Sequence, residues 1–256
     1  MHSITDDMLS LRPYYHPMQS VIPAEEKEVT YTEFLPCEAL RPFIYCYWEL
    51  KSPPRNTPFC YRVVADGCID LFFDCNAPQM SSLMGYCNTY VEFPITGAFH
   101  YVGVRFLPSA FPLLFGQDAF EISAQEIPLR EVVPALATFI TQQLEIPLSL
   151  ATIAQHLDNY FLCHLSQRPL QMDKRFFSAL LQILQSKGSI HISELDTGIS
   201  TRQLRRLFDY YIGDSPKTFS NIVRFQHILS TKAYHNHSFL DTYYDQAHFI
   251  KSFKTF

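Results

Sequence analysis

The hydrophobic pattern changes its period along the chain, and this change constrains the fold more than any other feature. Between residues 28 and 127 the apolar residues form short β-branched and aromatic runs, such as FIYCYWEL and RVVADGCIDLFF, separated by Pro, Gly and Asn. Runs of this kind are typical of the strands of a barrel or sandwich. Between residues 172 and 256 apolar residues recur at spacings of three and four, which predicts amphipathic helices. We therefore expect an α+β protein with its β-rich part first.

Four segments follow from this pattern. An N-terminal extension (1–27) precedes a β-rich sensing or dimerisation segment (28–127), which is followed by a helical connector (128–171) and a C-terminal helical segment (172–256). The chain has 256 residues, of which 47% are hydrophobic. A chain of this size can bury one large core, but we expect two smaller cores joined by a linker.

Several classes of protein lack support in the sequence. The seven cysteines form no Cys-x-x-Cys pair and the N-terminus has no signal-peptide pattern, which predicts a reduced, cytoplasmic setting. No apolar run reaches the roughly 20 residues of a membrane-spanning helix, so no membrane partner is expected. Glycine fingerprints of nucleotide sites and the Gly-x-Ser-x-Gly motif are absent, so we assign no catalytic residue and no cofactor.

Charge is distributed unevenly along the chain. The net charge is −5, but residues 172–256 carry 11 Lys and Arg against 7 Asp and Glu, whereas the remainder carries 9 against 18. The C-terminal segment is therefore basic and the rest is acidic. This asymmetry directs the search for a nucleic-acid interface to the C-terminal helices.

One predicted helix in this segment displays a basic face. Ser200 followed by Gln203 matches a capping box, and Leu204, Phe208 and their neighbours Leu207 and Tyr211 recur at helical spacing, so they should face the core. The side chains left outward are Thr201, Arg202, Gln203, Arg205, Arg206 and Asp209. Arginine can bind guanine O6 and N7, and glutamine can bind adenine. The alternative is an ordinary solvated helix face.

Three further helices are predicted around this one. Residues 173–187 form an amphipathic helix ended by Gly188. Ser215 followed by Pro216 is a specific start signal for a second helix, with a buried stripe of Phe219, Ile222, Val223 and Leu229. Asp245 caps a last helix, 245–256.

Two runs in this segment, STRQLRRLFDYYIGDSPKTFSNIVRFQHIL and YYDQAHFIKSFKTF, resemble the DNA-binding domain of the AraC/XylS family of transcription regulators. Upstream, RVVADGCIDLFF and YVGVRFLPSAFPLLFG resemble the N-terminal domain of one branch of that family, thought to be a cupin-like barrel. The resemblance implies a double helix-turn-helix domain that reads successive major grooves of double-stranded DNA. It also implies a small-molecule effector, a homodimer and RNA polymerase as partners.

The resemblance assigns the DNA contacts to two recognition helices. The first is the Ser200 to Tyr211 helix, whose contact candidates are Thr201, Arg202, Gln203, Arg205 and Arg206. In the second, the matching positions are Asp245, Gln246, Ala247, His248 and Lys251. Two departures from the family pattern stand out. Only Asp196 and Thr197 separate Leu195 from Gly198, so the supporting helix is shortened, and some five residues are absent before Tyr243, which shortens the second helix-turn-helix. The alternative function is a small-molecule or protein-interaction module whose degenerate helix-turn-helix no longer binds DNA.

Charged residues also occur within the predicted strands, where an unpaired charge is costly. Arg62, Asp66, Asp70 and Arg105 could bind a polar effector, or they could pair with one another. A metal site is not expected, because this region contains essentially one histidine, His100. The strand cysteines fit small hydrophobic core residues better than zinc ligands, whose spacings they do not match.

Overall fold

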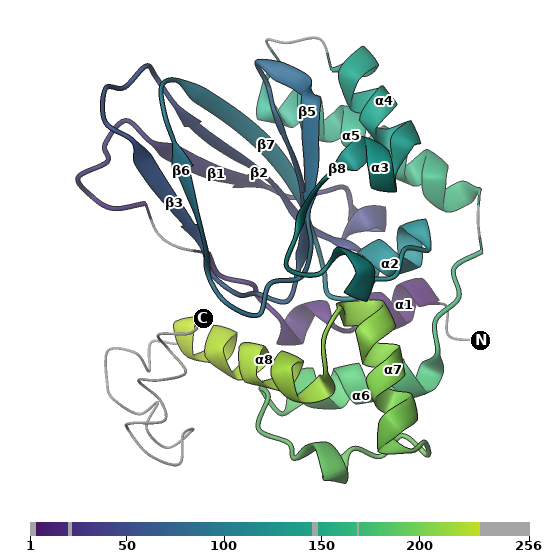
Figure 1. Cartoon of the computed structure of the whole chain (residues 1–256). Helices are drawn as coiled ribbons and strands as arrows, with labels where there is room; N and C mark the ends of the chain where they lie inside the picture. Colours follow the sequence, from purple (N-terminus) through teal and green to yellow (C-terminus); the bar gives the residue numbers. More distant parts are fainter. Residues whose placement is uncertain (1–3, 20–21, 145–147, 168, 231–256) are drawn as a thin grey trace.

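The computed structural model describes residues 4–19, 22–144, 148–167 and 169–230. The expected helix 245–256, with Asp245, Gln246, Ala247, His248 and Lys251, lies outside the described residues. The prediction of an α+β protein with its β-rich part first is confirmed (Figure 1).

Two antiparallel sheets form the β-rich part. The larger has six strands in the order β1 (Thr30–Phe34), β2 (Ile44–Ser52), β7 (Phe99–Phe106), β4 (Ile69–Asp74), β5 (Ala77–Met84) and β8 (Glu126–Pro128). The smaller pairs β3 (Phe59–Val63) with β6 (Val91–Ile95). The two sheets pack through aromatic rings: Phe59 on β3 lies 5.8 Å from Phe99 on β7, measured between ring centroids.

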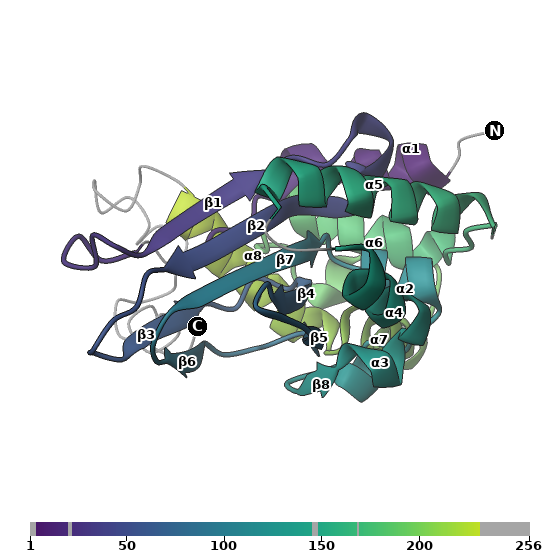
Figure 2. The same cartoon turned by 90° about the horizontal axis from the view of Figure 1, so that it is seen from above.

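Strand alternation gives the large sheet two different faces. On β4, Leu71 and Phe73 point into the main hydrophobic core, whereas Asp70 and Phe72 point toward the small sheet. On β2, Trp48 likewise faces the small sheet. The opposite face of the large sheet is covered by α5 (Leu150–Ser166), which lies against β1 and β2 (Figure 2).

The helical connector expected over residues 128–171 is divided into several elements. Its first residue belongs to β8, and α3 (Leu129–Val132), α4 (Pro134–Gln143) and α5 follow as separate helices. Val133 leaves the helical conformation, with φ −134° and ψ 74°, because a residue before proline is disfavoured in the α region. Shorter elements occur elsewhere: α1 (Ile4–Leu9), α2 (Ala110–Phe115) and the 3₁₀ turns η1 (Arg12–Tyr14), η2 (Glu38–Leu40) and η3 (Phe120–Ile122).

Within residues 169–230, the described C-terminal part has three α-helices, which lie below the sheets in Figure 1. They are α6 (Lys174–Gln185), α7 (Thr201–Ile212) and α8 (Pro216–Ser230), with a single 3₁₀ turn, η4 (Ile192–Glu194), between α6 and α7. The predicted helix starts at Asp173, Ser200 and Ser215 are confirmed: the side chain of each accepts a backbone N–H of the first helical turn.

The hydrophobic core is shared between the two parts, which corrects the expectation of two separate cores. One cluster of buried residues contains Leu71 and Phe106 from the sheet, Phe161 from α5, and Phe176 and Phe208 from the C-terminal helices. A smaller cluster lies between the two sheets. The C-terminal helices therefore pack on the β-rich part without an intervening solvent layer.

In the described part of the chain, no helix combines the length and the apolar character needed to cross a membrane.

Candidate functional site

Helix α7 is fixed at both ends by local hydrogen bonds. At its start, Ser200 Oγ accepts from the Gln203 amide at 3.3 Å, and Gln203 Oε1 accepts from the Ser200 amide at 3.1 Å. At its end, Gly213 adopts φ 100° and its amide reaches the carbonyl oxygens of Phe208 and Asp209. The predicted capping box is present, so the helix presents its side chains in a defined register.

The inner side of α7 packs on the neighbouring helices. Phe208 is fully buried, with ring centroids 5.1 Å from Phe176 on α6 and 6.1 Å from Phe219 on α8. Tyr211 stacks on Phe176 at 4.4 Å. Leu204 is buried as predicted, whereas Leu207 is half-buried. These contacts orient the opposite side of α7 toward solvent.

The outer side of α7 carries the basic face. All five residues assigned to it from the sequence are exposed, namely Thr201, Arg202, Gln203, Arg205 and Arg206. Arg205 lies 3.9 Å from Asp209 but remains 69% exposed, and such a pair contributes little. Arg202 and Arg206 form no salt bridge within the described ranges. This face is free to accept anionic partners.

Gln203 has a different role from the one its residue type suggests. Its side-chain oxygen accepts hydrogen bonds from both the amide and the hydroxyl of Ser200. Reading adenine requires the amide oxygen and nitrogen of glutamine together. Gln203 therefore acts as a helix cap.

The supporting helix expected before α7 is reduced to a single turn, η4. Helix η4 spans three residues, and one helical turn cannot support itself. Gln182 on α6 compensates: its Nε2 donates to the Asp196 carbonyl and its Oε1 accepts from the Asp196 amide, both at 3.1 Å. At the other end of the connection, Arg224 on α8 donates to the carbonyl of Gly188 at 2.6 Å. The segment between α6 and α7 is thus held by side chains of α6 and α8.

Helix α8 has more buried residues than its sequence pattern indicated. Phe219, Ile222 and Val223 are buried as predicted, whereas Leu229 is half-buried. Gln226 is also buried, and its Nε2 donates to the Ala65 carbonyl at 2.8 Å. No local pattern indicated the burial of Gln226, because its partner Ala65 lies more than 150 residues away in the chain.

The four charged strand residues divide into two groups. Arg105 is 2% exposed, and its Nη2 and Nε donate to the two carboxylate oxygens of Asp70 at 2.7 and 3.1 Å. Its Nε also lies 3.3 Å from Asp66. Arg62 lies elsewhere: it is 55% exposed and pairs with Glu92. Pairing therefore accounts for all four residues, but only three of them share a site.

These three residues line a cavity of about 180 Å³ between the two sheets. Burial raises the pKa of Asp70 to about 6, against the opposing effect of Arg105. Burial alone would lower the pKa of Arg105, but the neighbouring Asp70, Tyr31 and Asp66 raise it well above its usual value. Arg105 therefore stays positively charged at one end of the cavity.

The turn that carries Asp66 connects this cavity to α8. Gln226 donates to Ala65 within the turn, and Tyr15 donates to the Asp66 carbonyl. The ring of Phe219 on α8 packs against Gly67, where an added Cβ would lie 3.0 Å from it. The turn at residues 65–67 thus forms part of the cavity wall and also contacts α8.

No candidate metal site occurs in the part of the chain that the structure describes. No group of three or more His, Cys, Asp or Glu side chains there is arranged to hold a metal ion. His100 instead shares a hydrogen bond with Glu49, with 2.8 Å between Nε2 and Oε1.

Comparison with known proteins identifies one domain. A protein-family profile described as "Domain of unknown function (DUF6597)" matches residues 32–128, which include strands β2 to β8 and all of β1 except its first two residues. No curated protein matches the chain, and no solved structure matches it. The β-rich part of this chain is therefore a DUF6597 domain.

Proposed function

We propose that this chain is a sequence-specific, DNA-binding transcription regulator of the AraC/XylS type, and that α7 enters the major groove of double-stranded DNA. The observation that carries the proposal is the outer side of α7, where three exposed arginines project from a helix fixed at both ends. An α-helix with its side chains is about 10–12 Å wide, and the major groove of B-DNA is about 12 Å wide.

The spacing of the arginines suits this task. Arg202 and Arg206 are four residues apart, so they lie on the same side of the helix. Their like charges repel each other in water, and phosphate oxygens or guanine O6 and N7 would relieve that repulsion. Arg205 lies beside them and contacts only Asp209 weakly.

The surroundings of α7 support the same function. Helix α6, the η4 turn and α7 follow one another as in a helix-turn-helix unit, and α8 has the length of a spacer helix. The C-terminal segment is basic although the whole chain is acidic, and local positive charge favours the approach of DNA. A homodimer and RNA polymerase as partners follow from the family resemblance alone.

A salt titration tests the proposal. Binding of the full chain to duplex DNA should weaken steeply with salt, because each phosphate contact contributes about −0.9 to the slope of log K against log salt. The double variant Arg202→Ala, Arg206→Ala should bind more weakly and reduce the steepness of that slope by about 2. Arg130→Ala is the matched control, because Arg130 is an exposed arginine on α3. Absence of binding at low salt would refute the proposal.

The second candidate is a small-molecule-binding module that has lost DNA binding. Two observations favour it: the cavity between the sheets, and the reduction of the supporting helix to three residues. Under this candidate the arginines of α7 form a solvated helix face, and the double variant binds DNA no differently from the control.

A further inference from the structure

We infer that the cavity between the two sheets binds a small organic cation whose body is one aromatic ring or an aliphatic group of similar size. This inference deepens the proposed function and rests on it for its biological meaning, since such a ligand would be the effector of the regulator.

Size sets the first limit on the ligand. The cavity measures about 180 Å³, and an apolar cavity of about 150 Å³ is known to accept benzene. A ligand whose buried body is of roughly this size fits the cavity.

Aromatic rings from both sheets form the cavity walls. Trp48, Phe72 and Tyr101 line it from the large sheet, with Phe72 centred 6.4 Å from Trp48 and 6.3 Å from Tyr101. Tyr61 and Phe93 line it from the small sheet, where they are register partners. The faces of aromatic rings carry negative electrostatic potential and attract cations.

Charge at the cavity selects against anions. Three carboxylates, Asp66, Asp70 and Glu126, line it against one guanidinium, Arg105. Arg105 already donates to Asp70 through Nε and Nη2, and its Nη1 lies 3.5 Å from the Tyr31 hydroxyl. An anionic ligand would therefore approach a guanidinium that two carboxylates already neutralise.

The position of Trp48 supports a preformed site. Its Nε1 donates to Asp70 Oδ2 at 3.1 Å, which fixes the ring beside the carboxylate. Trp48 and Asp70 both line the cavity, where Asp66 and Asp70 outnumber the one guanidinium of Arg105, so a cation there lies near an aromatic ring and net negative charge. Neither Trp48 nor Asp70 needs to reorganise. Preorganisation of this kind lowers the cost of binding.

Three probes with the same ring test the inference: benzylamine, benzyl alcohol and benzoate. Trp48 is the only tryptophan of the chain, so its fluorescence reports occupancy of the cavity directly. We expect saturable binding of benzylamine, at least about tenfold weaker binding of benzyl alcohol, and no binding of benzoate. Equal affinities for the three probes, tighter binding of benzoate, or no saturable signal from benzylamine would each overturn the inference.

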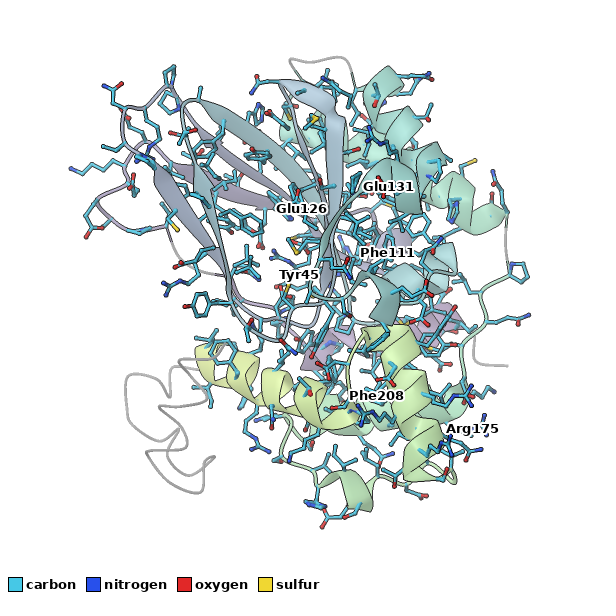
Figure 3. All side chains as sticks on the ribbon, in the orientation of Figure 1. Tyr45, Phe111, Glu126, Glu131, Arg175 and Phe208 are labelled. Atoms are coloured by element: carbon cyan, nitrogen blue, oxygen red, sulfur yellow. The ribbon has the colours of Figure 1, made fainter. Side chains whose placement is uncertain are left out.

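A pair of exposed glutamates supplies the variants. Glu126 lines the cavity, whereas the nearby Glu131 on α3 does not (Figure 3). Glu126→Gln should lower benzylamine affinity by about threefold, as expected for one exposed charge pair, and leave benzyl alcohol affinity unchanged. Glu131→Gln is the matched control and should change neither. An equal effect of both variants on benzylamine would show that only general surface charge is involved.

Cation binding and DNA binding are measured separately, so their failures can be told apart. Salt-dependent DNA binding without benzylamine binding would overturn the inference alone. Benzylamine binding without any DNA binding would overturn the proposed function and leave the cavity as a ligand site.

Discussion

Phe208 is the side chain on which the shared core can be tested most directly. It lies on α7, is 0% exposed, and contacts Phe176 and Phe219. Phe219 in turn reaches the N-terminal segment, with its ring centroid 6.3 Å from that of Tyr15. Removing the ring by Phe208→Ala therefore opens a cavity at the junction of the helical and β-rich parts (Figure 3).

The expected loss of stability is large. A Phe→Ala change at a fully buried position costs about 3–5 kcal/mol, which combines the lost transfer free energy with the cavity left behind. For a chain of this size each kcal/mol lowers Tm by about 2–4 °C, so we expect a decrease of roughly 6–20 °C. Phe120→Ala is the control, because Phe120 is 62% exposed, and its Tm should change little.

Two spectroscopic probes decide whether the core is continuous. Trp48 fluorescence reports the β-rich part, because Trp48 lies on β2, and circular dichroism at 222 nm reports mainly the helices. With one shared core both signals should shift together in the Phe208 variant. If the helical signal melts early while the Trp48 transition stays at the wild-type temperature, the two parts unfold independently and the reasoning is refuted.

Three further predictions concern local features. Ser200→Ala removes the cap of α7 and should cost about 1 kcal/mol, seen as a lower Tm together with weaker DNA binding; unchanged values would show that the cap has no role. Gly188→Ala should destabilise the protein far more than Gly198→Ala, although both glycines have positive φ. The new Cβ would lie 2.2 Å from the α8 backbone at position 188 and would meet nothing within 4 Å at position 198. Equal losses of unfolding free energy in chemical denaturation would contradict this. Burial raises the pKa of Asp70 to about 6, so this carboxylate is protonated below that pH and charged above it. Benzylamine should therefore bind more weakly at about pH 5 than at about pH 7.5. A pH-independent affinity would argue against Asp70 as a partner.

Local sequence signals predicted several features of helices α6, α7 and α8. The start signals at Asp173, Ser200 and Ser215, and the separation of outward arginines from inward apolar residues on α7, are all present in the structure. Each depends on residues no more than four positions apart. The helix break at Val133 also has a local cause, because Pro134 follows it directly. Apolar periodicity alone did not reveal this break.

Other features could not be derived from periodicity. Asp70 and Arg105 were recognised as costly charges, but their pairing depends on the register in which β4 lies beside β7. Arg62 carries the same charge within a similar strand, yet it faces outward and binds Glu92. The buried amide of Gln226 was missed, because nothing near it in sequence needs a hydrogen bond.

The sequence by itself determined where α7 begins and ends and which of its side chains face outward, because capping and helical spacing are satisfied within one or two turns of the chain. Only the tertiary structure decided that the helices share a core with the sheets, that Asp66, Asp70 and Arg105 meet at one cavity, and that the Asp66 turn also seats α8. These features join residues tens to hundreds of positions apart, and their free energy comes from burial and charge pairing that no single segment can make alone.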